Sequence, residues 1–392
     1  MKAVEKNAVL IVLSSFRAEG TPLLAIELCR HWLSWGISPY ILSLERFPPQ
    51  VRSEFEKLGV TIALGTFKEV GYRRYPKLSY DVFKTCRWLH PKAVLSMPSG
   101  IHAFIAMGAR AAGVSRIAVH QGSYPFHWKI LAFRKYWLEY QLGRPFTGTT
   151  VSCSRYVDHG VAKHLHLKDS ERTVVYNGID LAKFEAVAQE RALAMRSKEQ
   201  EFTVAMVGRL DGTKDQATLI RAVGLLRKRS PRLNVKLLLV GDGANRLDLE
   251  GLSRHCGVED DVEFLGVRSD IPRILGESDL FVYSVNRDEG LGIALIEAMA
   301  AGVPVVASNV QACREVLAEG QAGFIVPEQN PAAMADAMEH VLNDADATAA
   351  RARHAKRRAK EVFSAEAMAR SYAKILGVLP QSSQDERAPR AS

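Results

Sequence analysis

The sequence predicts an α/β protein with two doubly wound domains, each a parallel sheet covered by helices on both faces. Short apolar runs alternate with helical patterns over nearly the whole chain, which is the signature of repeated βαβ units. A length of 392 residues suffices for two such domains, each with its own core. A polar stretch without a strand, residues 180–201, separates two series of alternating elements. We therefore place the domain boundary near residue 190.

The first domain is predicted over residues 1–190. Its apolar runs have the length and β-branched content of buried strands. These strands are expected at residues 8–13, 40–44, 60–64, 93–96, 117–120, 150–152 and 173–176. Helical patterns fall between them, as at 23–35 and 100–112.

The second domain is predicted over residues 191–362 by the same alternation. Its strands are expected at residues 202–207, 237–240, 262–265, 280–283, 305–307 and 323–326. A further helical pattern covers 363–378. The polar tail 381–392, which contains Pro, Ser and Arg, is expected to be disordered.

The composition is that of a globular protein, with 47% apolar and 24% charged residues. Five cysteines are scattered singly, which favours a reducing compartment over a disulfide framework or a zinc site. The apolar run at 9–13 favours a first core strand over a signal peptide, and no segment approaches the roughly 18 apolar residues needed to cross a bilayer. A cytoplasmic location is expected, so any membrane contact would be peripheral.

The net charge of +9 is unevenly distributed. Residues 1–180 hold 24 Lys and Arg against 13 Asp and Glu, which is +11, and the remainder of the chain carries −2. Any acidic partner should therefore meet the first half. No dense basic tract occurs outside 351–360, so nucleic acid is not expected as a partner.

The most informative pattern is the segment 288–304, DEGLGIALIEAMAAGVP, which follows a predicted strand. Gly290, Leu291 and Gly292 would open a helix whose unpaired amides and positive dipole end suit a diphosphate or sugar hydroxyls. Glu289 and Glu297 are eight residues apart, about 80° around a helix, so one ligand could touch both. The alternative is a surface helix with two solvated acids.

A second pattern, VGRLDGTK, follows the predicted strand at 202–207. Its two cations, Arg209 and Lys214, lie in a strand-to-helix loop where both can face one diphosphate. The arginine fork also matches the geometry of phosphate oxygens. A solvated surface loop is the alternative.

Together these segments resemble the Glu-x7-Glu motif and phosphate loop of retaining GT-B glycosyltransferases, family 4, also called glycosyl transferases group 1. The resemblance covers about residues 8–378 and is most specific at 200–327. It implies two Rossmann-like domains facing a central cleft, the first for the acceptor and the second for a nucleotide sugar. It also implies that the terminal helix packs back towards the first domain.

The resemblance assigns roles to matching positions. Glu289 would line the sugar and the reaction centre, and Glu297 would bind the ribose hydroxyls of the nucleotide. Arg209 and Lys214 would stabilise the leaving diphosphate, and Arg268 is a candidate near the nucleobase.

Two matches fall in the first domain. Gly20 would bring its backbone close to the donor phosphate. His120 matches an active-site histidine near the sugar, and the alternative is a strand-end histidine satisfied by backbone groups.

The implied activity is that of a retaining, metal-independent hexosyltransferase acting on a lipid-linked or cell-surface glycan precursor, as in polysaccharide or lipopolysaccharide biosynthesis. Family frequency favours a UDP-sugar as the donor, with GDP-mannose second. No cofactor or metal is expected, because no Asp-x-Asp follows a strand; Asp344 and Asp346 are interpreted as a surface turn. Alternatives are a sugar-nucleotide epimerase or hydrolase of the same fold, or a non-catalytic nucleotide-sugar-binding protein.

Two basic aromatic stretches, 72–77 (YRRYPK) and 124–137 (YPFHWKILAFRKYW), accompany the positive charge of the first half. Aromatic rings suit the headgroup zone, and Lys and Arg attract anionic lipid. These stretches predict docking of the first domain on the inner face of the plasma membrane. The alternative is that the apolar residues of the second stretch form a core helix or the wall of an acceptor pocket.

Overall fold

The protein is described by a computed structural model covering residues 7–17, 20–45, 47–65, 74–125, 130–193 and 201–379. The chain divides into two compact units, one of Met1–Gly178 with Ala365–Ser392 and one of Ile179–Ser364. The tail expected to be disordered, 381–392, lies outside the described residues.

The first unit is built on a seven-stranded parallel sheet in the order β3-β2-β1-β4-β5-β6-β7. Its strands are β1 (Ala8–Leu13), β2 (Ser38–Ser43), β3 (Thr61–Leu64), β4 (Ala93–Ser96), β5 (Arg116–Gln121), β6 (Thr149–Ser152) and β7 (Arg172–Val174). All six residues of β1 are buried, and Ile11 pairs with Ile41 and Leu95. A continuous apolar run of this kind is what a central parallel strand needs, because helices cover both of its faces.

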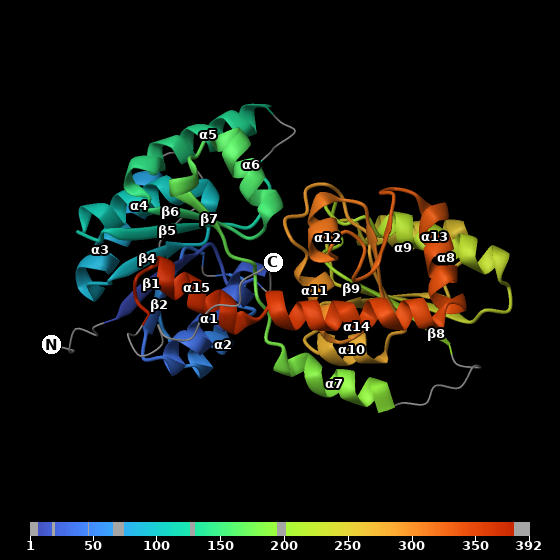
Figure 1. Ribbon diagram of the computed structural model, residues 1–392. Helices are drawn as coiled ribbons and strands as arrows, with labels where there is room; N and C mark the ends of the chain where they lie inside the picture. Colours follow the sequence, from blue (N-terminus) through green and yellow to red (C-terminus); the bar gives the residue numbers. More distant parts are fainter. Residues whose placement is uncertain are drawn as a thin grey trace. The chain divides into compact units, whose positions relative to one another are not determined.

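Helices cover both faces of the first sheet. They are α1 (Gly20–Ser34), α2 (Arg52–Lys57), α3 (Arg74–Leu89), α4 (His102–Ala111), α5 (Ile130–Gly143), α6 (Arg155–Leu165) and α15 (Ala365–Ile375). Helix α4 packs between α3 and α5, and α1 contacts α2 and α15 (Figure 1). Residues 78, 82, 86 and 89 of α3 face one core with 105, 106 and 109 of α4, which is the spacing of an amphipathic helix.

Helix α15, which is the C-terminal helix of the chain, belongs to the first unit. The indole of the fully buried Trp32 in α1 donates a hydrogen bond to the carbonyl of Ala369 (2.9 Å). The Arg370 guanidinium lies 5.3 Å from the ring centroid of Trp35. The first unit is therefore completed by a segment that follows the whole second unit in the sequence.

The second unit repeats the design with a six-stranded parallel sheet in the order β10-β9-β8-β11-β12-β13. Its strands are β8 (Phe202–Val207), β9 (Val235–Val240), β10 (Val262–Gly266), β11 (Leu280–Tyr283), β12 (Val305–Ser308) and β13 (Phe324–Val326). Its helices are α7 (Ala182–Leu193), α8 (Gln216–Arg229), α9 (Arg246–Cys256), α10 (Ile271–Glu277), α11 (Ile293–Ala300), α12 (Gln311–Val316), α13 (Pro331–Asn343) and α14 (Ala345–Val362).

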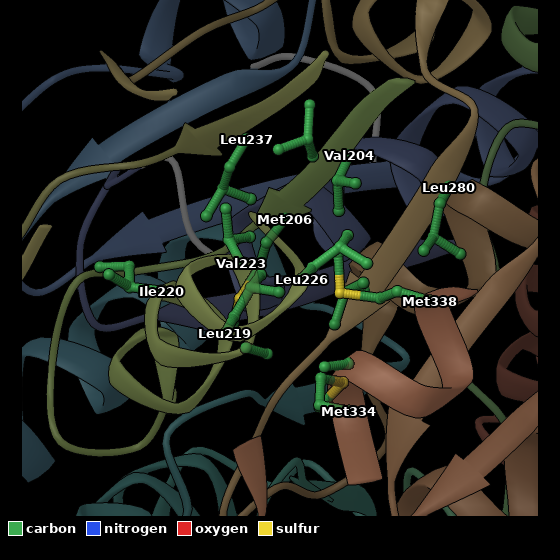
Figure 2. Packing of buried hydrophobic residues seen from close by; sticks show 14 of the residues in the cluster. Val204, Met206, Leu219, Ile220, Val223, Leu226, Leu237, Leu280, Met334 and Met338 are labelled. Carbon is green, nitrogen blue, oxygen red and sulfur yellow. The ribbon is translucent and has the colours of Figure 1, made fainter. Parts of the chain in front are cut away.

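The core of the second unit lies between the sheet and helices α8 and α13. Figure 2 shows Leu219 and Val223 of α8 and Met334 and Met338 of α13 directed at strand residues such as Val204. Each of these five side chains is almost completely buried. Unbranched methionines fill the space that the branched residues leave.

The predicted α/β class is confirmed, and each of the thirteen strands in the described part of the chain overlaps a predicted one. All five cysteines are free thiols. No helix among residues 7–17, 20–45, 47–65, 74–125, 130–193 and 201–379 is long and apolar enough to cross a bilayer.

The boundary between the units differs from the expected position near residue 190, because it follows Gly178. Helix α7, which the sequence placed on the first domain's side, packs against α10 and α11 of the second unit. Gly276 of α10 permits this approach, since a Cβ at that position would overlap Cγ1 of Val187 in α7. Because α7 is largely polar, its hydrophobic periodicity does not indicate that it packs against the second unit.

We therefore expect Gly276→Ala to destabilise the second unit by about 1 to 3 kcal/mol through overpacking. Adding Val187→Ala should restore most of the loss. The matched control is Gly251→Ala in α9, where an added Cβ meets only the flexible tip of Arg254 at 4.0 Å; it should stabilise by up to about 1 kcal/mol. Urea unfolding measures the stability of all three variants. Equal effects of Gly276→Ala and Gly251→Ala would contradict the packing of α7 against α10.

Candidate functional site

The candidate site of the second unit lies where the strand order of its sheet reverses. Strands β8 and β11 are neighbours, and the chain leaves them towards opposite edges of the sheet. Ligands of doubly wound folds bind at such switch points, outside the carboxyl ends of the strands. The loop after β8 carries Arg209 and Lys214, and the loop after β11 carries Glu289.

The two loops are joined through their backbones. The Asp215 amide donates to the Ser284 carbonyl (3.0 Å), and Lys214 forms an antiparallel bridge with Val285. The side-chain amide of Asn286 adds a hydrogen bond to the Gly212 carbonyl (2.8 Å). Asp215 also caps helix α8 by accepting from the Thr218 amide (3.2 Å). The positions of the charged side chains are thus set by the sheet and by a capped helix.

Lys214, Tyr283 and Glu289 form a compact cluster at this edge. The Lys214 Nζ donates to the Tyr283 hydroxyl (2.7 Å) and is ion-paired with Glu289 Oε2. The Tyr283 hydroxyl in turn donates to the same carboxylate oxygen (2.7 Å). The side chains of Lys214 and Glu289 are only 12% and 14% exposed. Each member of the cluster therefore provides a hydrogen-bond or charge partner for polar groups that are nearly buried and would otherwise have none.

The electrostatics of the cluster favour an ionised Glu289. Burial would raise the pKa of Glu289, but the positive charge of Lys214 and hydrogen bonds from Lys214, Tyr283 and the Leu291 amide hold that pKa below its usual value. Burial and the negative charge of Glu289 raise the pKa of Tyr283 well above 10. The tyrosine hydroxyl is therefore protonated and available as a donor at neutral pH.

The sequence did not identify Tyr283 as a site residue, although a signal was present. It is the last residue of the apolar run LFVY, directly before the loop that bears Glu289. A hydroxyl at the carboxyl end of a buried strand at a switch point is placed to reach a ligand or another site residue. The long separation from Lys214 in the sequence concealed their contact.

The start of helix α11 departs from the expected geometry. Glu289 was placed on one helix with Glu297, but α11 begins at Ile293, so Glu289 lies in the preceding loop and the helical-angle argument was wrong. Gly292 has φ 91° at the N-cap, and a Cβ there would lie 2.8 Å from Cε1 of Tyr283. Only glycine tolerates both the positive φ and the close approach of the Tyr283 ring.

The amides expected to cradle a diphosphate are partly engaged by the protein itself. The Gly290 amide donates to Glu289 Oε1 (3.1 Å), and the Leu291 amide also donates to that carboxylate. Glu289 is therefore held between a lysine on one side and the amides before α11 on the other.

Arg209 is placed differently from Lys214. Its side chain is 58% exposed, and its Nε lies 3.3 Å from Asp211 Oδ2. Its backbone carbonyl accepts from the buried Gln216 side chain (2.9 Å), so the main chain is fixed and the guanidinium extends into solvent at the same edge. Arg209 is the accessible cation of the pair, and Lys214 is the enclosed one.

Glu297 lies on α11 and is partly exposed. Burial raises its pKa to about 7, and the charge of Lys183 in α7 opposes this shift only in part. Lys183 contributes from the helix that the sequence assigned to the other domain. A carboxyl group whose pKa lies near 7 can accept hydrogen bonds from hydroxyl groups of a ligand.

Arg268 is not brought to the cluster. It follows β10, the edge strand, two strands away from β8, or about 10 Å along the sheet. Its guanidinium forms a bidentate pair with Asp270 (2.8 and 2.7 Å). That interaction, more than any other, lowers the pKa of Asp270 to about 2.

The two first-unit candidates lie at the carboxyl edge of the first sheet, one at the start of a helix and one near the end of a strand. Gly20 is the first residue of α1, and His120 is a buried residue at the end of β5. The His120 Nδ1 is 2.8 Å from the Tyr372 hydroxyl of α15, and burial lowers the pKa of His120 to about 4. The imidazole is therefore neutral at pH 7. Its partner is a tyrosine side chain, whereas the alternative interpretation expected a backbone group.

The two basic aromatic stretches are only partly accessible. Tyr75 is buried and stacked on Phe104 (4.4 Å), and Tyr136 is buried with its hydroxyl on Gln121 (2.8 Å). These two rings are core residues, contrary to the expectation that they face a membrane. Residues 72, 73 and 126–129 lie outside the described part of the chain.

Within the part of the chain that the structure describes, no group of three or more His, Cys, Asp or Glu side chains is placed to hold a metal ion.

The solved structures that resemble this chain share its two-unit architecture. The Anabaena protein HepE, in complex with UDP and glucose, superposes with a TM-score of 0.80 at 20% identity, covering 94% of this chain and 99% of that one. Sucrose-phosphate synthase from Thermosynechococcus elongatus gives a TM-score of 0.78 at 17% identity, covering 96% and 100%. The fold class is therefore GT-B, as the sequence predicted.

The family match lies in the second unit. Residues 190–361 match the model of the family "Glycosyl transferases group 1", the group that the sequence resembles. D-inositol 3-phosphate glycosyltransferase of Salinispora arenicola is 35% identical over 202 residues, 47% of this chain and 45% of that protein. Phosphatidyl-myo-inositol mannosyltransferase of Mycobacterium tuberculosis is 31% identical over 225 residues, 50% and 57%. The chain thus spans about half the length of the curated relatives that it matches.

We expect Lys214→Met to lower the free energy of unfolding by about 2 to 3 kcal/mol, because it leaves the Glu289 carboxylate unpaired in a largely buried position. Glu289→Gln in the same chain should recover most of that loss. Arg209→Met is the matched control, and with its exposed side chain it should change stability by less than about 0.5 kcal/mol. Urea unfolding measures the free energy of unfolding of each variant. An unchanged value for Lys214→Met would show that the pair of Lys214 and Glu289 is not formed.

Glu297 predicts a defined pH dependence of stability. Its folded pKa lies above the unfolded value of 4.5, so the stability it contributes is complete below pH about 4.5 and is lost as the pH rises through about 7. Glu297→Gln, which stays uncharged, should therefore melt higher than the wild type at pH 8 and equally at pH 4.5. Thermal unfolding at the two pH values measures this, and an equal gain at both would exclude titration of Glu297 as the cause.

Proposed function

We propose that the protein is a retaining glycosyltransferase that moves a sugar from a nucleotide-sugar donor to an acceptor hydroxyl. The observation that carries the proposal is the meeting of Lys214, Tyr283 and Glu289 at the switch point of the second sheet, within the residues that match glycosyl transferases group 1. An epimerase, a hydrolase or a non-catalytic binder would need no glycan acceptor. Turnover with and without an acceptor therefore distinguishes these alternatives from a transferase.

The donor diphosphate would lie between the two cations that follow β8. Negative charge grows on the diphosphate as the sugar leaves, and charge stabilisation in a nearly dry site is worth far more than in water. Lys214 is enclosed and pre-positioned by Tyr283, whereas Arg209 is exposed and able to close over the phosphate. The positive end of α11 points to the same edge.

Glu289 would orient the sugar at the reaction centre. Its carboxylate is kept ionised by Lys214 and held in place by Tyr283 and two backbone amides. When the diphosphate draws Lys214 towards itself, the carboxylate becomes able to accept hydrogen bonds from sugar hydroxyls. Retention would follow from attack of the acceptor on the face from which the diphosphate departs.

The nucleotide would extend from the diphosphate along the edge of the second sheet. Glu297 would accept hydrogen bonds from the ribose hydroxyls, and Arg268, about 10 Å further along, would lie near the base. UDP-sugars are the first choice and GDP-mannose the second. The complexes of HepE with UDP and with UDP-glucose support this order.

The first unit would bind the acceptor, on a lipid-linked or cell-surface glycan precursor such as that of a polysaccharide or lipopolysaccharide. Gly20 would approach the donor phosphate, and neutral His120 would donate a hydrogen bond near the sugar. No metal enters this scheme, because Arg209, Lys214 and the α11 terminus supply the positive charge.

The proposed function is tested by transfer from UDP-glucose or GDP-mannose to glycan acceptors, with donor alone as a control. Arg209→Ala should lower turnover by about 100-fold, since it removes one charge-assisted contact to the leaving group, and should leave Tm unchanged. Glu289→Ala should also cut turnover, whereas Glu297→Ala should mainly weaken nucleotide binding. Activity should survive EDTA. Turnover that needs no acceptor, or wild-type turnover of Arg209→Ala, would sink the proposal.

A peripheral position on the inner face of the plasma membrane extends the proposal. Helix α3 exposes a stripe of three cations and two aromatic rings on one face, and its members are Lys77, Tyr80, Lys84, Arg87 and Trp88. Tyr80 is 61% and Trp88 65% exposed. A stripe of this composition suits an anionic bilayer, since the rings enter the headgroup zone while the cations meet lipid phosphates.

We expect the triple substitution Lys77→Ser, Lys84→Ser and Arg87→Ser to weaken sedimentation with anionic vesicles at least about tenfold, at about 1 kcal/mol per cation. The matched control removes the same charge from α14 of the second unit, through Arg353→Ser, Arg357→Ser and Lys360→Ser. It should bind like the wild type. Equal recovery of the wild type with neutral and anionic vesicles would exclude the membrane position while leaving the transferase proposal intact.

A further inference from the structure

A pocket of about 320 Å³ opens between helices α5 and α6 of the first unit. Its lining consists of Phe133, Arg134, Trp137, Lys163, His164 and His166. No acidic side chain is among them. The volume is near the lower limit for small-molecule pockets, so one ring with one substituent would fill it.

The pocket is built by packing that fixes both helices. The Gln141 side chain in α5 donates to the Leu165 carbonyl at the end of α6 (2.8 Å). The loop before α5 crosses α6 at Gly160, where a Cβ would lie 2.8 Å from Cδ of Pro125. His164 is held below the pocket by the Tyr124 hydroxyl (3.2 Å), with its ring edge-on to Phe133. The cavity thus has a rigid floor.

The cations at the rim differ from Arg144 and Arg172 of the same unit. Arg144 pairs with Glu171 and Arg172 pairs with Asp158, both across separate elements. Within the described residues, Arg134, Lys163 and His166 show neither an ion pair nor a side-chain hydrogen bond. Unopposed cations gathered around a concavity favour an anion there.

The aromatic rings define the rest of the ligand. Trp137 and Phe133 provide apolar ring surface beside the cations, which suits the C–H faces of a sugar and not a bare inorganic ion. The pocket lies at the C-terminal end of α6, whose first residue follows the carboxyl end of β6. Eleven helical residues place it about 16 Å from that edge, so it is separate from the edge where Gly20 and His120 lie.

We propose that this pocket is an accessory binding site for a sugar phosphate, with the phosphate on Arg134, Lys163 and His166 and the sugar ring on Trp137. The inference does not depend on transferase activity, because binding alone tests it. The sugar phosphate could be soluble, or it could be the inositol phosphate headgroup of a lipid; both present the same chemistry.

The backbone at His166 supplies a way to separate ligand contact from folding. His166 ends α6 in the left-handed region, with φ 55°, where glycine is favoured. His90, which follows α3, has φ 51° and lines no described pocket. Replacing either histidine by glycine should relieve the same strain, so only a difference in binding distinguishes the two positions.

The test is calorimetric titration of the full chain with glucose 1-phosphate, with glucose and inorganic phosphate as reference ligands. Binding should be at least about tenfold tighter for glucose 1-phosphate than for either reference, and Arg134→Ala with Lys163→Ala should weaken it at least about tenfold. The control pair Arg353→Ala with Arg357→Ala on α14, both exposed, should bind like the wild type. Vesicles containing phosphatidylinositol should compete if a lipid headgroup is the source, and not if the source is soluble.

His166→Gly and His90→Gly should each raise Tm by roughly 1 to 3 °C, while only His166→Gly loses affinity for glucose 1-phosphate. Three results would overturn the proposal. Unchanged affinity in the Arg134 and Lys163 double variant places the ligand elsewhere. Displacement by UDP places it in the donor site. Equal affinity for inorganic phosphate reduces the pocket to an anion site without a sugar.

Discussion

The ion pair between Lys214 and Glu289 is the interaction on which the ligand edge of the second unit depends. Both side chains are largely removed from water, so neither charge is tolerable without the other. Tyr283 completes the cluster by hydrogen-bonding to both, and its ring in turn requires glycine at position 292. The loops after β8 and β11, which are also joined through their backbones, and the start of α11 are therefore tied together by one pair of buried charges.

The same pair bears on the proposed diphosphate site. Lys214 is oriented by Glu289 of the protein itself, so in the proposed function an incoming phosphate would exchange one anion for another instead of stripping the lysine of water. Arg209, at the same edge, is exposed, so its pairing with Asp211 is open to water. The two cations that the sequence treats alike thus differ in what they contribute to folding.

Local signals in the sequence were sufficient for the fold and for placing Lys214 and Glu289 in loops that meet at one edge of a sheet, but not for Arg268, which the structure keeps apart. The strands are continuous apolar runs, as in β1, and the charged motifs directly follow strands. What could not be predicted depends on contacts between distant residues. Tyr283 meets Lys214 from 69 residues away, and His120 meets Tyr372 from 252. Helix α7 has a polar pattern and docks only because α10 carries a glycine, which moved the boundary between the units.

A crystal structure of the protein with UDP would show whether the diphosphate binds at the pair of Lys214 and Glu289. We expect the diphosphate at the ends of β8 and β11, with the Lys214 amine turned from Glu289 to a phosphate oxygen and with Tyr283 still donating to the carboxylate. Glu297 should then contact the ribose. A diphosphate bound elsewhere, with Lys214 still paired to Glu289, would show that this pair is not the donor site.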